Sequence, residues 1–138
     1  MLAENTVLTG RRAITRSYAK INLTLDVLSK RENGYHDIKM IMQTVSLFDL
    51  ILVDKTHRGI SISTNLPYLP CNEKNIAYKA ADAFFKATGI RGGAKIVIHK
   101  NIPVAAGLAG GSGNCAAVLT AINMLHGNPL SNDELMHI

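Results

Sequence analysis

The stretch Pro103-Val-Ala-Ala-Gly-Leu-Ala-Gly-Gly-Ser-Gly-Asn-Cys-Ala-Ala117 holds four glycines and one hydroxyl, and it runs into a helical pattern. Glycine adopts backbone angles that side chains forbid, and it lets a ligand approach the main chain closely. The helix expected from Ala116 to about His126 has unpaired N–H groups and a positive dipole end at its first turn. The stretch therefore predicts either a phosphate site or a tight loop that lets a small-residue helix pack closely.

Two other glycine motifs fit this stretch less well. The Walker motif needs a Lys just before its hydroxyl, and no Lys follows Lys100. The dinucleotide fingerprint matches at Gly111-Ser-Gly-Asn-Cys-Ala116, but it should follow directly on a strand, here one ending at Val104. The nearest predicted strand ends near Lys100, and Asp133 lies in a helix start. A Rossmann-type dinucleotide binder with a parallel sheet remains an alternative.

Composition and charge narrow the class of protein. The 138 residues, 47% of them hydrophobic, suit one domain with a core, and no apolar run approaches the roughly 18–20 residues of a membrane span. The first twelve residues lack the apolar core of a secretory signal, so we expect a cytoplasmic protein. A net charge of +5 favours anionic partners, but few aromatics and no basic run disfavour nucleic acid. Cys71 and Cys115 do not have a metal or redox spacing.

The first half of the chain predicts strands. Residues 1–12 are expected to form a flexible arm. The sequence from Ala13 to Leu28 then alternates with period two, which predicts a long strand with one face on the core. Its core face is expected to carry Ser17, Ala19, Ile21, Leu23, Leu25 and Val27. Lys20 and Asn22 would stand about 7 Å apart on the other face, where such a pair more often belongs to a solvated surface.

A hairpin turn is predicted next. Asn33-Gly34 is the turn signal, and Tyr35 and His36 follow at the mouth of the next strand. Such a pair either packs its ring edges there or stacks on a base and hydrogen-bonds to it. The stretch from Asp37 to Leu52 predicts two strands that are broken near Phe48-Asp49.

The second half predicts further strands over 59–64 and 94–100 and helices over 75–88 and 114–126. Asn72 or Asn75 would cap the first helix, and Gly89 would end it. Ser131-Asn-Asp-Glu134 is a capping box that opens another helix, with Leu135 and Ile138 on its buried side. Because only four residues follow that Glu, we expect the chain to be truncated.

Three motifs together carry a resemblance. Ala19-Lys-Ile-Asn-Leu23, Asn33-Gly-Tyr-His36 and the glycine stretch, in this order and spacing, resemble the N-terminal half of GHMP superfamily kinases that act on 4-diphosphocytidyl-2-C-methyl-D-erythritol. The resemblance covers residues 14–138. It implies an α+β fold, the GHMP-kinase N-terminal domain (ribosomal protein S5 domain 2-like), which has a mostly antiparallel sheet with helices packed on one face. Residues 13–138 would be this ATP-binding domain.

The same resemblance implies a reaction and its partners. The enzyme would use ATP and Mg²⁺ to phosphorylate the 2-hydroxyl of the cytidyl methylerythritol, in the non-mevalonate route to isoprenoids. Its partners would be this small molecule and ATP, with no nucleic acid and no membrane. Phosphoryl transfer requires mainly positioning and charge stabilisation, which loop N–H groups and a lysine supply.

The resemblance also implies roles for individual residues. Lys20 would act as the catalytic lysine beside the acceptor hydroxyl, Asn22 would contact substrate, and Tyr35 and His36 would hold the cytosine. Asn75, Lys100 and Val104 would lie near the adenine. No residue is expected to be a metal ligand. The ATP phosphates would be wrapped by Pro103, Val104, Ala105, Ala106, Gly107, Leu108, Ala109, Gly110, Gly111, Ser112 and Gly113.

The chain departs from the family pattern in several places. Ala109 stands where the family has Gly, so its methyl would crowd a backbone approach, and Gly113 lacks the hydroxyl of a second Ser. Cys115 replaces a usual Ala. The family's general base, an Asp in a Gly-x-Asp-Val-Pro-Phe stretch, would lie beyond Ile138, as would the C-terminal domain. These departures leave open a non-catalytic nucleotide-binding domain.

Overall fold

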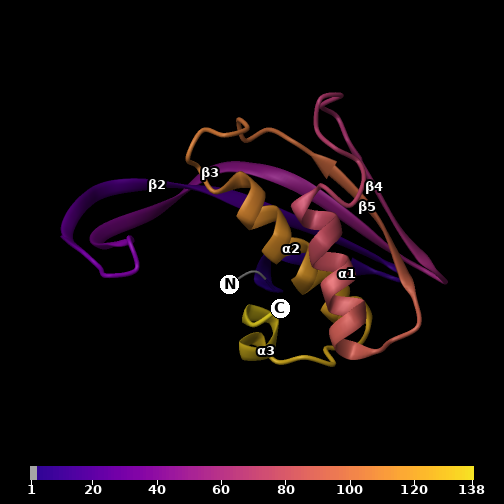
Figure 1. The fold of residues 1–138 in the computed structure, drawn as a ribbon. Helices are drawn as coiled ribbons and strands as arrows, with labels where there is room; N and C mark the ends of the chain where they lie inside the picture. The colour runs from indigo at the N-terminus through magenta and orange to yellow at the C-terminus, as the bar shows by residue number, and fades with distance from the viewer. Residues whose placement is uncertain (1–2) are drawn as a thin grey trace.

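A mixed five-stranded sheet forms the body of the protein. The computed structural model describes residues 3–138, and its strand order is β1-β2-β3-β5-β4. Every neighbouring pair is antiparallel except β4 with β5, and the helices α1 and α2 cover one face of the sheet (Figure 1). The elements are η1 (Ala3–Asn5), β1 (Thr6–Thr9), β2 (Arg12–Lys30), β3 (His36–Thr56), β4 (Gly59–Thr64), α1 (Ile76–Thr88), β5 (Gly93–His99), α2 (Gly110–Leu125) and α3 (Asn132–Met136).

This topology confirms a mostly antiparallel α+β sheet and overturns the Rossmann alternative. A Rossmann unit requires a parallel sheet and a strand that leads directly into its glycine loop. Here β3 is antiparallel to both of its neighbours, and β5 ends at His99, well before Val104.

The core lies between the sheet and the two long helices. Side chains of β3, β5, α1 and α2 are fully buried there, Phe84 the largest of them. The predicted strand of β2 is confirmed, but its alternating face is buried only as far as Ala19. The residues from Ile21 to Lys30 are exposed because the β2–β3 hairpin extends beyond the helices (Figure 1). The prediction that the core face of β2 includes Ile21, Leu23, Leu25 and Val27 is therefore wrong.

The expectation of a flexible arm is wrong for Thr6–Thr9. These residues form β1, which pairs antiparallel with the start of β2 from Thr6↔Thr15 to Thr9↔Arg12. A strand of four residues is too short to display a period-two pattern, so its sequence carries little signal. Residues 1–2 lie outside the described residues.

The predicted break near Phe48-Asp49 is also wrong, because β3 is one continuous strand. The irregularity lies just before it. Tyr18 pairs with Phe48, whereas Lys20 pairs with Thr44, so the ladder shifts register there. Such a bulge lets a long strand bend without ending.

The helix signals are confirmed in type but not always in extent. The Asn75 side chain caps α1, and Gly89 ends it with a φ of 65°. The capping box of Ser131 and Glu134 opens α3 as predicted. On its expected buried side, Leu135 packs against the core, whereas Ile138 is 40% exposed.

The second helix begins earlier than its sequence predicts. It starts at Gly110 instead of 114–116, so Gly110, Gly111, Ser112 and Gly113 form its first turn. Glycine weakens helices in isolation, but packing against β2 and β3 overrides that preference here. Within residues 3–138, the helices are all too short or too polar to span a bilayer.

We predict that Gly93→Ala lowers the free energy of unfolding by about 1–3 kcal/mol, because overpacking distorts the β4–β5 pairing. A Cβ at Gly93 would lie 2.1 Å from the Gly59 carbonyl oxygen, which is backbone and cannot rotate away. The matched control is Gly92→Ala, whose Cβ would approach only side chains of Phe85 and His126, at 3.4 Å. Urea unfolding of both variants checks this, and equal midpoints would contradict it.

Candidate functional site

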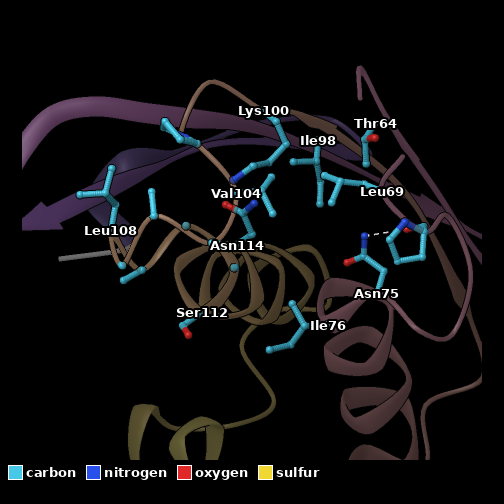
Figure 2. Close-up of a pocket in the computed structure, with 18 of the residues that line it drawn as sticks. Thr64, Leu69, Asn75, Ile76, Ile98, Lys100, Val104, Leu108, Ser112 and Asn114 are labelled. Carbon is cyan, nitrogen blue, oxygen red and sulfur yellow. Dashed lines mark hydrogen bonds between the residues drawn. The ribbon is translucent and has the colours of Figure 1, made fainter. Parts of the chain in front are cut away.

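A pocket of about 460 Å³ lies where the first turns of α1 and α2 meet the loop that follows β5 (Figure 2). Its volume falls within the range of small-molecule sites. Residues 103–112 form one wall, parts of 69–76 form the other, and the end of β5 closes the pocket. The remaining lining residues are Thr64 and Asn114.

The pocket is electropositive. A Cβ at Gly111 would lie 4.0 Å from Ile76 Cγ2, so the first turns of α1 and α2 adjoin. The first N–H groups of a helix have no acceptor within the helix, and they carry the positive end of its dipole. Lys74 and Lys100 line the pocket, and although Asp49 pairs with Lys100 from behind, no carboxylate of the described residues lines the pocket itself. This combination suits a phosphorylated ligand.

The loop over the pocket is held in an unusual conformation. Ala105, Gly107 and Ala109 all have positive φ, at 58°, 72° and 61°. Ala109 is the N-cap residue of α2, and its carbonyl accepts from the Gly113 N–H at 2.8 Å. A residue with a Cβ is disfavoured in this region, so the Ala109 methyl strains the backbone itself. This conformational strain is a different effect from the predicted crowding of a backbone approach, which stays a prediction.

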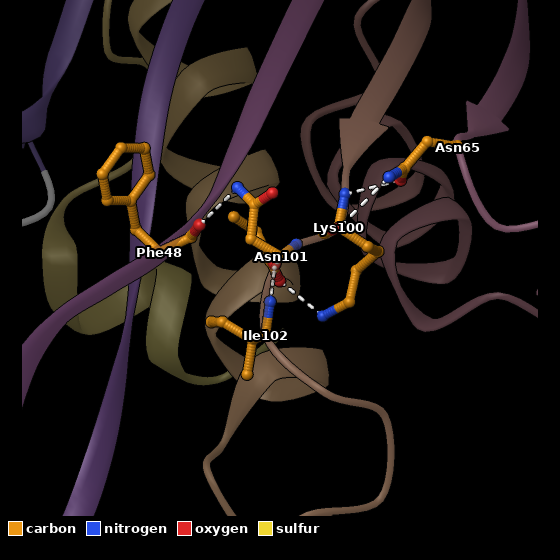
Figure 3. Close-up of polar contacts among 6 residues, drawn as sticks. Phe48, Asn65, Lys100, Asn101 and Ile102 are labelled. Carbon is orange, nitrogen blue, oxygen red and sulfur yellow. Dashed lines mark hydrogen bonds and ion pairs between the residues drawn. The ribbon is translucent and has the colours of Figure 1, made fainter.

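A buried carboxylate secures the start of the loop. Asp49, on β3, is fully buried, and its Oδ2 accepts from Lys100 Nζ at 2.5 Å. Its Oδ1 accepts from the backbone N–H groups of Asn101 and Ile102, both at 2.8 Å. The Asn65 side-chain amide pairs with the backbone of Lys100. It donates to the Lys100 carbonyl and accepts from the Lys100 N–H (Figure 3).

Sequence reasoning assigned no role to Asp49. The signal available was a single Asp in the apolar run Leu47-Phe-Asp-Leu-Ile-Leu-Val53. A charged residue on a strand's core face is rarely buried unless it has a partner, but the sequence does not show which partner.

The residues expected near an adenine all line the pocket: Asn75, Lys100 and Val104. The side chain of Asn75 is already engaged, since its Oδ1 accepts from the Ala77 N–H and its Nδ2 donates to the Pro70 carbonyl. Asn75 therefore caps α1 and ties the 69–76 wall to it (Figure 2).

Lys20 and Asn22 lie beside the loop without lining the pocket. The Lys20 backbone N–H donates to the Leu108 carbonyl at 3.1 Å, and Lys20 Nζ donates to Asn22 Oδ1 at 3.2 Å. The β2 strand thus touches the glycine loop at the position of Lys20. This backbone bond places Lys20 next to the glycine loop.

Tyr35 and His36 are not brought to the pocket. Tyr35 is 75% exposed in the turn of the β2–β3 hairpin, and His36 pairs with Lys30 at its tip. Lys30 lies ten residues beyond Lys20 along β2, which is roughly 33 Å of extended strand.

Gly113 faces the sheet and does not line the pocket. A Cβ there would lie 2.5 Å from Ser17 Oγ, a buried hydroxyl with no hydrogen-bond partner among the described residues. The other residues predicted to wrap phosphates, Pro103 to Ser112, all line the pocket. Cys115 is half-buried behind them, and its burial raises the pKa of its thiol, which keeps it protonated at neutral pH.

Comparison with known proteins identifies the fold. Residues 75–138 match the family described as GHMP kinases N terminal domain. A crystal structure of 4-(cytidine 5'-diphospho)-2C-methyl-D-erythritol kinase superimposes with a TM-score of 0.79 and 35% identity, covering 90% of this chain and 44% of that one. The mevalonate kinase of Methanococcus jannaschii has a TM-score of 0.66 at 17% identity, covers 94% of this chain and 45% of that one, and so supports the fold alone. The chain has the fold of a GHMP kinase N-terminal domain, as predicted.

Particular relatives confirm the resemblance of the three motifs. A 4-diphosphocytidyl-2-C-methyl-D-erythritol kinase of Clostridium botulinum (strain Alaska E43 / Type E3) is 49% identical over 123 residues, 89% of this chain and 44% of the relative. That of Caldicellulosiruptor saccharolyticus is 51% identical over 126 residues, 91% of this chain and 43% of the relative. The chain thus spans less than half the length of the curated relatives it matches.

We predict that Ala109→Gly stabilises the fold by about 0.5–1 kcal/mol. Removing the Cβ relieves about 1–2 kcal/mol of left-handed strain, and the extra freedom of glycine in the unfolded chain offsets part of this. Ala106→Gly, in the same loop without a positive φ, is the control and should destabilise by roughly 0.5–1 kcal/mol. Chemical denaturation measures both, and the same sign for the two variants would refute the strain at Ala109.

Proposed function

We propose that this chain is the ATP-binding N-terminal part of a kinase that phosphorylates the 2-hydroxyl of 4-diphosphocytidyl-2-C-methyl-D-erythritol. The observation that carries the proposal is the pocket: two helix N-termini and a glycine loop converge on it without a carboxylate. The identity of the phosphate acceptor is inferred from the names of the relatives. Residues 13–138 would be the ATP-binding domain, and we expect the enzyme to act in the cytoplasm on this small molecule.

The pocket suggests how ATP would lie. The backbone N–H groups of Gly110, Gly111 and Ser112 are first-turn donors of α2, where they would receive the phosphates. The base would then occupy the side formed by Asn75, Lys100 and Val104. Such preorganised donors stabilise charge that develops on the transferred phosphoryl group.

Lys20 would stabilise that charge from the neighbouring strand. Its backbone bond to Leu108 fixes the strand beside the loop, and its bond to Asn22 Oδ1 orients the ammonium group. A positioned ammonium group can also lower the pKa of an acceptor hydroxyl. The acceptor would lie near Lys20 and Asn22, and Tyr35 and His36 would hold its cytosine with their exposed rings.

Mg²⁺ would enter with the phosphates of ATP. No group of three His, Cys, Asp or Glu side chains in residues 3–138 is placed to hold a metal, and the side-chain oxygens that line the pocket belong to hydroxyls and amides: Thr64, Ser112, Asn75 and Asn114. Mg²⁺ usually keeps several waters and binds through substrate phosphates with one or two carboxylates. The residues of this pocket therefore fit ATP well but supply no carboxylate ligand for its metal ion.

A non-catalytic nucleotide-binding domain is the second candidate. It is favoured by the absence of a carboxylate among the described pocket residues that could accept a proton from the acceptor hydroxyl. Both candidates require ATP binding, and they differ in whether the chain transfers phosphate.

We predict that the chain binds ATP with Mg²⁺ and transfers phosphate to the cytidyl methylerythritol. Phosphorus NMR detects the new phosphomonoester, and calorimetric titration measures ATP binding. Lys20→Ala should lower the transfer rate by about a hundredfold or more while ATP affinity stays close to that of the parent chain, because Lys20 lies outside the pocket. The control is Lys95→Ala, an exposed strand lysine on β5.

Each outcome distinguishes the candidates. Product that is lost in Lys20→Ala supports the kinase. ATP binding without product contradicts phosphate transfer by this chain alone, as expected of a non-catalytic domain or an incomplete kinase site, and no ATP binding contradicts both candidates. If ATP affinity falls as much as turnover in Lys20→Ala, the role of Lys20 in transfer is wrong.

A further inference from the structure

Two residues of the loop that follows β5, Lys100 and Ile102, pack directly on the first residue of α2. A Cβ at Gly110 would lie 2.9 Å from Lys100 Nζ and 3.0 Å from Ile102 Cγ2, so both groups already touch the space where a side chain would be. Lys100 and Ile102 are both buried. The position of the first turn of α2 therefore depends on where these two residues are held.

Asp49 holds both of them. Its Oδ2 accepts from the Lys100 ammonium at 2.5 Å, and its Oδ1 accepts from the Ile102 backbone N–H at 2.8 Å. The carboxylate is fully buried and belongs to β3, which β5 and β2 flank in the sheet. A continuous path of contacts thus leads from the centre of the sheet through Lys100 and Ile102 to Gly110.

We propose that Asp49 is a positioning residue of the nucleotide site, which fixes the first turn of α2 relative to the sheet. This inference rests on the proposed binding of ATP at Gly110, Gly111 and Ser112. Asp49 itself does not line the pocket, so it acts through Lys100 and Ile102 and not by touching the ligand.

The charges explain why a carboxylate is needed. An ammonium group beside a helix N-terminus is repelled by the positive end of the dipole, and burial adds a desolvation cost. Asp49 neutralises Lys100 there. In Asp49→Asn the amide oxygen still accepts from the Asn101 and Ile102 N–H groups, but the Lys100 ammonium loses its counter-charge. The Lys100 ammonium group then moves away from Gly110 toward solvent in the pocket. The first turn of α2 loses its contact with Lys100 at Gly110.

The test compares Asp49→Asn with Asp54→Asn. Asp54 lies five residues later on the same strand and pairs with Arg12, away from the pocket, so the control carries the same chemical change. ATP affinity is measured by calorimetric titration at a temperature where circular dichroism shows each variant folded. The backbone amide chemical shifts of Gly110, Gly111 and Ser112 are measured in the same samples without ATP.

The proposal expects Asp49→Asn to weaken ATP binding at least about tenfold and to shift the three amides, while Asp54→Asn stays within about twofold of the parent chain and leaves them in place. If Asp49 serves only the stability of the fold, Asp49→Asn lowers the melting temperature. The ATP affinity and the chemical shifts of the three amides then stay unchanged in the folded fraction. Unchanged affinity and amides, or tighter ATP binding through a freed Lys100, would overturn the proposal.

If Asp49→Asn does not fold, the double variant Asp49→Asn/Lys100→Met replaces it, because no buried charge is then left unpaired. The proposal expects the same displacement of the Gly110 amide, since the ammonium contact is absent, and an undisplaced amide would overturn it. A parent chain that binds no ATP would contradict the proposed function, whereas the amide shifts would still decide whether Asp49 positions the helix.

Discussion

The buried carboxylate of Asp49 is the interaction on which the site depends. β5 ends at His99, so the N–H groups of Asn101 and Ile102 leave the sheet without a partner strand. Buried backbone donors must be paired, and Asp49 accepts from both while it neutralises Lys100. The loop can therefore leave the sheet abruptly and turn at once toward α2. The loop over residues 103–109 and the first turn of α2 come directly after that turn in the chain.

Close packing and the proposed binding of phosphate are compatible uses of the same glycine stretch. Gly110 lacks a side chain because Lys100 and Ile102 fill that space, and Gly113 because Ser17 does. These contacts bring the first turn of α2 against the sheet, which leaves its free N–H groups facing the pocket. The two interpretations of the glycine stretch, tight packing and phosphate binding, are therefore compatible with one arrangement.

The long β2–β3 hairpin is a separate part of the architecture. Only the first part of β2 and the last part of β3 are covered by helices, and the outer part of the hairpin is exposed. Lys20 lies where β2 leaves the covered part of the sheet, next to the loop, whereas Tyr35 lies in the exposed turn. The residues assigned to the acceptor are thus divided between the middle of β2 and the far end of the hairpin, while those assigned to ATP, except Gly113, gather in one pocket.

The sequence by itself determined most of the local elements and the resemblance to GHMP kinase N-terminal domains, because caps, turns, strand alternation and short motifs depend on neighbouring residues. Asn75 and Gly89 bound α1, and the box of Ser131 and Glu134 opens α3, as their sequences predict. Only the tertiary structure decided where α2 begins, how far the face of β2 is buried, and which partner Asp49 has. Each of these depends on groups from distant parts of the chain, such as Asp49 with Lys100, whose proximity exists only after the sheet and helices have packed.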